Sequence, residues 1–83
     1  MIDIIYFASL KAIVGKGQES LDLGPETTVG QLAQIISKTS PQMGEMIREK
    51  KVMISVNQDM ADNDTIIHDG DEVAFLPPFS GGA

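Results

Sequence analysis

The sequence contains no cysteine and a single histidine, His68, so several kinds of chemistry are excluded at once. Without a thiol, the chain cannot form a disulfide, a thiolate nucleophile or a thiolate metal site, and any sulfur chemistry must use sulfur that arrives from elsewhere. A catalytic triad needs a base beside its nucleophile. Because His68 falls in a predicted turn, we expect a solvated side chain there rather than a general base.

Long hydrophobic runs are also missing. No stretch of eighteen apolar residues occurs, and the first residues, MIDIIYF, carry neither the basic region nor the cleavage site of a secretion signal. We therefore expect a cytoplasmic protein without membrane contact. Its 83 residues, 42% of them hydrophobic, suit one small domain with one modest core.

Lysine and arginine are absent from residues 52–83, whereas residues 1–51 balance six basic against six acidic side chains. The C-terminal part therefore holds the whole net charge of -6, on Asp59, Asp62, Asp64, Asp69, Asp71 and Glu72. Such a field argues against nucleic-acid binding, and we expect it to steer the tail end toward a basic partner surface, with solubility alone as the alternative. The carboxylates lack calcium-loop spacing, so no metal site is expected.

The apolar pattern and the turn residues predict an α+β domain with a mixed sheet and one main helix. Thr28 and Gln31 have the spacing of a capping box and precede helically spaced apolar residues, which predicts the main helix over 29–38. Pro41 opens a second, short helix through Ile47. Strands are predicted at 1–7 and 19–23, joined as an N-terminal hairpin by a turn at Gly15 and Gly17, and at 52–56, 65–67 and 72–76.

One helix covers only one face of such a sheet, so the other face meets water or a partner. Asp3 and Glu72 are costly to bury and so mark the outward phase of their strands. Ile5 and Phe7 share the phase of Asp3, whereas Ala74 and Leu76 share that of Glu72. We expect this apolar row to bind a partner, with ordinary surface hydrophobicity as the alternative. The residues expected to point inward are Ile2, Ile4, Tyr6, Val73 and Phe75.

The chain ends in FLPPFSGGA. Pro77 and Pro78 cannot continue a strand, so the predicted domain covers residues 1–78 and a flexible tail covers 79–83. Glycine has no side chain, and residues 80–82 can extend on the order of 10 Å into a narrow channel. A frayed end is the alternative.

Several short motifs together resemble a known family. They are Phe7-Ala8, Val56-Asn57-Gln58, the segment DGDEVAF at 69–75, Pro77-Pro78 and Gly81-Gly82. In length, order of elements and motif spacing the chain resembles the ubiquitin-like sulfur carriers of the MoaD/ThiS type, and within that family the small subunit of molybdopterin synthase. The resemblance implies a β-grasp fold.

The resemblance also implies a mechanism in which a ubiquitin-activating-like partner enzyme uses ATP to adenylate the carboxylate of Gly82. Conversion to a thiocarboxylate follows, and its sulfur passes to a pterin precursor on the large synthase subunit. The chain alone would be no enzyme and would bind no cofactor. The resemblance assigns the reactive arm to Gly81 and Gly82, and partner contacts to Phe7, Lys11, Met60, Leu76, Phe79 and Ser80.

Ala83 departs from the family pattern, in which the second glycine is last. Removal of Ala83 by a protease is the interpretation we favour, and activation of Ala83 itself or loss of function are the alternatives. The sequence also leaves open sulfur transfer for thiamine, the tungsten cofactor or tRNA, and a β-grasp interaction module or protein modifier without sulfur chemistry.

Overall fold

The computed structural model describes residues 1–78. In that part of the chain the elements follow the order β1 (Ile2–Tyr6), α1 (Ser9–Val14), β2 (Gln18–Leu21), β3 (Glu26–Thr28), α2 (Val29–Ser37), α3 (Pro41–Arg48), β4 (Met53–Val56), β5 (Asp59–Met60), β6 (Ile66–His68) and β7 (Glu72–Leu76).

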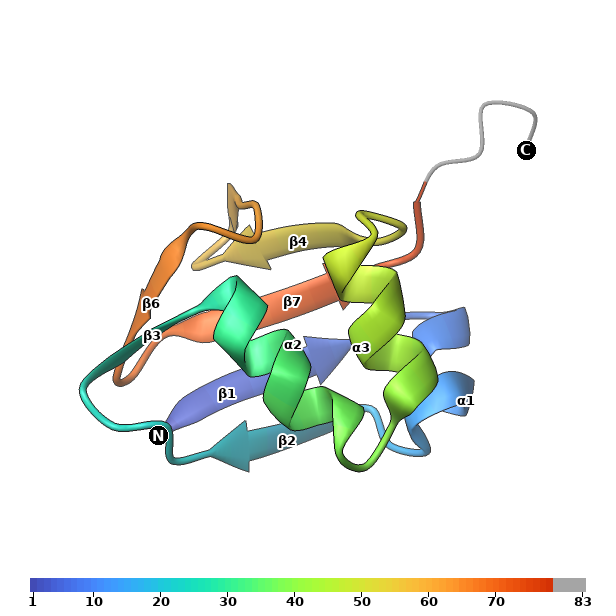
Figure 1. Cartoon of the computed structure of the whole chain (residues 1–83), viewed down its shortest axis with the longest axis horizontal. Helices are drawn as coiled ribbons and strands as arrows, with labels where there is room; N and C mark the ends of the chain where they lie inside the picture. Colours follow the sequence, from blue (N-terminus) through green and yellow to red (C-terminus); the bar gives the residue numbers. More distant parts are fainter. Residues whose placement is uncertain (79–83) are drawn as a thin grey trace.

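Five strands form the main sheet in the order β2-β1-β7-β4-β5 (Figure 1). The central pair, β1 and β7, is parallel, with Asp3 opposite Glu72, and the other pairs are antiparallel. A separate two-stranded sheet joins β3 to β6. The main sheet is therefore mixed, as predicted, and its centre unites the first strand with the last one described.

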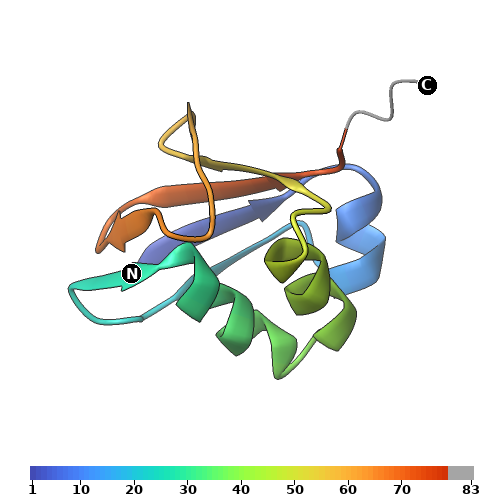
Figure 2. The ribbon, with the colours of Figure 1, turned by 45° about the horizontal axis from the view of Figure 1, so that its top comes forward.

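Helices α2 and α3 lie on the same side of the main sheet (Figure 2). The predicted capping box at the start of α2 is confirmed: Thr28 Oγ1 accepts the Gln31 N–H at 3.2 Å, and Gln31 Oε1 accepts the Thr28 N–H at 3.2 Å. The two helices approach closely at Gly44, where an added Cβ would lie 1.7 Å from Ser37 Oγ. Both helices thus cover one face, although the sequence predicted a single main helix in that role.

The residues predicted to point inward are all buried. The side chains of Ile2, Ile4, Tyr6, Val73 and Phe75 are fully enclosed. The rings of Tyr6 and Phe75 stack with centroids 5.8 Å apart, and the Tyr6 hydroxyl donates to Glu19 Oε2 at 2.6 Å. Burial raises the pKa of Tyr6, and the contact with Glu19 raises it further. The alternation of these strands was therefore interpreted correctly.

The two strands of the predicted N-terminal hairpin are present, but the predicted turn between them is wrong. The strands pair antiparallel, but α1 lies between them in place of a simple turn. Gly15 ends this helix in the left-handed conformation, at φ 88°, and donates to Lys11 O at 2.7 Å. The glycine that appeared to mark a hairpin turn is a helix C-cap.

The sequence analysis also missed β3 and placed β6 one residue early. Glu26, in β3, pairs with His68, so a strand of only three residues on each side forms the smaller sheet. Segments this short carry too few alternating positions to stand out from a loop. Strand β5, of only two residues, was not predicted either, and β2 ends two residues before its predicted limit. Strands β1, β4 and β7 and helices α2 and α3 begin and end within about one residue of their predicted limits.

Candidate functional site

The sheet face opposite α2 and α3 carries an apolar surface, which we call the apolar face. Strand pairing sets Met53 opposite Leu76, and the N–H of Phe7 donates to Phe75 O at 3.0 Å beside them. Phe7 is 41% exposed and Met60 is 71% exposed, which is high for hydrophobic residues. The apolar face consists of Ile5, Phe7, Met53, Met60, Ala74 and Leu76.

The members of the apolar face differ in exposure because of their position in the sheet. Ala74 is only 8% exposed, since it is small and lies between Ile5 and Ser55 on the neighbouring strands. Met60 belongs to the edge strand β5 and pairs with Ser55, so the surface continues from the centre of the sheet to its edge. The predicted outward phase is confirmed, and apolar side chains lie on it in four strands, with Ser55 between Ala74 and Met60.

Met53 is a surface residue that the sequence analysis did not include in the apolar row. It is half-buried and lies directly opposite Leu76. The signal was present in the sequence: Val52, Ile54 and Val56 are buried, so the alternation of the strand assigns Met53 to the outward phase. Met43, by contrast, is fully buried.

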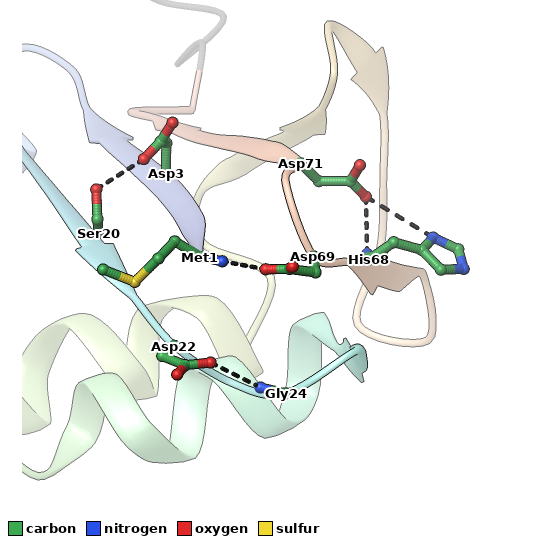
Figure 3. Close-up of polar contacts among 8 residues, drawn as sticks. All are labelled: Met1, Asp3, Ser20, Asp22, Gly24, His68, Asp69 and Asp71. Atoms are coloured by element: carbon green, nitrogen blue, oxygen red, sulfur yellow. Dashed lines mark hydrogen bonds and ion pairs between the residues drawn. The ribbon is translucent and has the colours of Figure 1, made fainter.

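The polar border of the apolar face lies where β1 and β7 begin. Asp3 and Glu72 are paired in register and exposed, and the Ser20 hydroxyl donates to Asp3 Oδ1 at 2.7 Å (Figure 3). A depression of about 180 Å³ at this border is lined by these groups and by Gln18. The face is thus apolar toward the end of β7 and polar toward its beginning.

The chain leaves the sheet beside the most apolar part of this face. Leu76 is the last residue of β7, Pro77 is half-buried and Pro78 is exposed. The residues predicted to form the reactive arm and part of the partner contact, Phe79, Ser80, Gly81 and Gly82, lie outside the described residues, as does Ala83. The apolar face therefore lies beside the end of β7, two residues before Pro78, the last described residue.

The backbone at Ala8 positions Phe7 and the start of α1. Ala8 adopts φ 52° and ψ -128°, a combination that glycine adopts readily and other residues rarely do. The Leu10 N–H closes this turn by donating to Phe7 O at 3.1 Å. Lys11 follows on α1 and is exposed, at the end of the sheet where β1 ends. The structure thus brings Phe7 and Leu76 together, with Met60 two strands away and Lys11 on a separate element.

The acidic groups Asp69 and Asp71 lie just before the start of β7, at the opposite end of that strand from Pro78. Steering of the tail end by these charges stays a prediction. Figure 3 shows Asp69 in contact with the Met1 nitrogen, and Asp71 in contact with His68. Asp71 accepts the His68 N–H at 2.8 Å and the Asn57 amide at 3.0 Å, and these hydrogen bonds hold the pKa of Asp71 below its usual range.

His68 has an exposed side chain, as predicted, and lies 3.6 Å from a carboxylate oxygen of Glu26. Among residues 1–78 there is no group of three or more side chains of the metal-binding types that could hold an ion. No helix in this part of the chain is both long and apolar enough to cross a membrane.

Comparison with known proteins gives a consistent result. The ThiS family model matches residues 4–82. The chain is 32% identical over 83 residues to the molybdopterin synthase sulfur carrier subunit of Escherichia coli, covering 99% of this chain and 100% of that one. The structure of a putative molybdopterin converting factor subunit 1 from Pyrococcus furiosus superposes with a TM-score of 0.78 at 26% identity, covering 93% of this chain and 95% of that chain.

A complex of subunits 1 and 2 of the molybdopterin-converting factor from Helicobacter pylori contains a chain of the same fold, with a TM-score of 0.64 and 20% identity over 98% of this chain and 97% of that chain. The arrangement of a mixed sheet against helices is the β-grasp, ubiquitin-like fold predicted from the sequence, and the prediction is confirmed. Because the family model matches nearly the whole chain, the protein belongs to the ThiS family.

Proposed function

We propose that this protein is the sulfur carrier subunit of a molybdopterin synthase. Its relatives with that name align over their full length, and the Helicobacter pylori complex pairs a chain of this fold with a second subunit. The observation that supports the proposal most directly is the apolar face beside the end of β7, six residues before Gly82 in the sequence.

The proposed chemistry takes place on the carboxylate of Gly82, after removal of Ala83. A partner adenylating enzyme joins this carboxylate to the α-phosphate of ATP and releases pyrophosphate, which turns a poor electrophile into a reactive acyl-adenylate. Sulfur at the sulfide oxidation level attacks the carbonyl carbon and expels AMP, leaving a thiocarboxylate. No side chain of the carrier takes part, which suits a protein without cysteine.

The thiocarboxylate sulfur then attacks a carbon of a pterin precursor held by the large synthase subunit and displaces an oxygen-linked leaving group from that carbon. Hydrolysis of the resulting thioester breaks the acyl C–S bond, leaves the sulfur on the pterin and restores the Gly82 carboxylate. In this proposal the carrier is no enzyme by itself but the small subunit of a transferase complex in the cytoplasm. Gly81 and Ser80 form the arm. Lys11 and Phe79 contact the partner beside the apolar face, which binds the adenylating enzyme and the large subunit in turn.

The experiment is an intact-mass measurement. The 83-residue chain and a version ending at Gly82 are each incubated with ATP, the cognate adenylating enzyme and sulfide. We expect a mass gain equal to the replacement of one oxygen by one sulfur in the shorter form only, because the Gly82 carbonyl of the longer form is held in an amide. A gain in neither form contradicts the proposal, and a gain in the longer form contradicts the removal of Ala83.

A further inference from the structure

A groove of about 300 Å³ lies between the edge strand β5 and strand β6. Two of the most exposed hydrophobic side chains of the described chain line it: Met60, 71% exposed, and Ile66, 51% exposed. Asp59, Asp71 and His68 complete its border. The groove therefore combines apolar side chains with carboxylates, away from the end of β7.

The side chains around this groove carry negative charge without lysine or arginine to balance it. Residues 52–78 contain no lysine or arginine. Asp59 pairs with Val56 through the backbone of β5, and its side chain makes no hydrogen bond or ion pair within residues 1–78. Asp71 keeps its negative charge because hydrogen bonds from His68 and Asn57 stabilise the carboxylate. A guest with a positive charge and an apolar stem matches these groups, as the side chains of arginine and lysine do.

The edge of β6 is not open to a further strand at this point. The His68 N–H donates to the Asp71 carboxylate at 2.8 Å, and the His68 carbonyl accepts the Asp71 N–H at 3.0 Å. Strand addition would have to break both bonds. The groove is also small for a cofactor, so a single long side chain is the occupant that its size favours.

Met60 belongs both to the apolar face and to this groove. A protein that covers the apolar face therefore reaches the groove across the edge of β5. We propose that the large synthase subunit places an arginine or lysine side chain in this groove, with its stem between Met60 and Ile66 and its charge beside Asp59 and Asp71. This inference rests on the proposed function, because it takes the large subunit as the protein that covers the face.

The test uses the purified large subunit and the 83-residue chain, with dissociation constants measured by calorimetry at low and at high salt. Asp59→Lys reverses a charge at the groove, and Asp64→Lys makes the same change at an exposed position that does not line it. We expect Asp59→Lys to weaken binding about tenfold and to reduce the salt dependence, with Asp64→Lys within about twofold of wild type. Ile66→Ser should weaken binding without changing the salt dependence.

Equal effects of Asp59→Lys and Asp64→Lys would overturn the inference, since general charge would then explain both. Phe7→Ser separates the two proposals. If Phe7→Ser weakens binding and the groove variants do not, the groove inference fails alone. If wild-type protein does not bind the large subunit at all, the proposed function and the groove inference fail together.

Discussion

At the scale of single residues, Ala8 has a strained backbone conformation. Its φ of 52° with ψ of -128° costs on the order of 1–3 kcal/mol for a residue with a Cβ, and the strain lies directly beside Phe7. Two backbone hydrogen bonds hold this turn in place: the Leu10 N–H donates to Phe7 O, and the Lys11 N–H donates to Ala8 O. Strain next to an exposed, apolar side chain is typical of a position selected for binding.

Ala8→Gly should therefore stabilise the protein. Glycine adopts this conformation without strain but loses more chain entropy on folding, so we expect a net increase in the free energy of unfolding of about 1 kcal/mol. Ala12→Gly, within α1 at an exposed position, is the control and should destabilise by a similar amount. Urea unfolding of both variants measures the difference, and a loss of stability in Ala8→Gly would show that the turn is not strained.

Asp71 should give the stability of the fold a measurable pH dependence. Its pKa is lowered in the folded state, so its contribution is present above the ordinary pKa and is lost as the pH falls through the folded value. We expect Asp71→Asn to be less stable than wild type at pH 7, with the gap closing below about pH 4. Asp64→Asn removes the same charge and should show no such gap. A gap that stays constant with pH contradicts the assignment.

At the scale of elements, the contact of α2 with α3 depends on Gly44. A Cβ there would lie 1.7 Å from Ser37 Oγ and 2.8 Å from the carbonyl oxygen of Ala33, and the latter cannot turn away. Ser37 itself donates to Ala33 O at 2.8 Å and accepts from Arg48 at 2.9 Å, so moving it costs two hydrogen bonds. The glycine allows the two helices to cover one face of the sheet together.

Gly44→Ala should accordingly lower the free energy of unfolding by about 1–3 kcal/mol, although alanine favours helices over glycine. Gln42→Ala, exposed in the same helix, is the control and should change stability little. Thermal unfolding followed by circular dichroism compares them. A more stable Gly44→Ala would mean that the helices separate at little cost.

The elements also show what the sequence could and could not predict. Alternation identified β1 and β7 with their inward residues, and the capping box identified α2, because each of these patterns is local and long enough to repeat. Helix α1 was missed because its first turn has no capping side chain and Ala8 enters it in a rare conformation. The gathering of the acidic groups away from the end of β7 follows from strand order, which no local pattern contains.

At the scale of the whole molecule, the acidic side chains and the most apolar part of the sheet face lie at opposite ends of β7. Carboxylates gather where β7 begins, whereas Lys51 and Lys50 lie two and three residues before Met53, respectively, and Met53 is opposite Leu76. The end of β7 therefore lies near two lysines, one of which forms an ion pair with Glu49. The part of the candidate site that the sequence predicted best was the outward phase of the strands; the groove beside β5 depends on tertiary contacts between distant segments.

The apolar face should matter for binding and hardly for folding. Phe7→Ser combined with Met53→Ser removes exposed or half-buried side chains, so we expect a change in unfolding free energy of about 1 kcal/mol or less. Binding to the large subunit should weaken by a factor of about 100, because apolar anchors dominate interfaces. Calorimetry for binding and urea unfolding for stability test both halves. Unchanged binding would show that the partner uses another face.

The parallel pairing of β1 with β7 at the centre of the sheet has a consequence for synthesis. Strand β1 cannot form the central pair of the sheet until β7 has been synthesised. A chain emerging from the ribosome therefore cannot complete its core until Leu76 has left the ribosome. The apolar face is built from β1, β4, β5 and β7 and exists only after that moment. A partner that recognises this face would therefore bind only folded chains. Truncated or misfolded carriers would not be bound and would remain without sulfur.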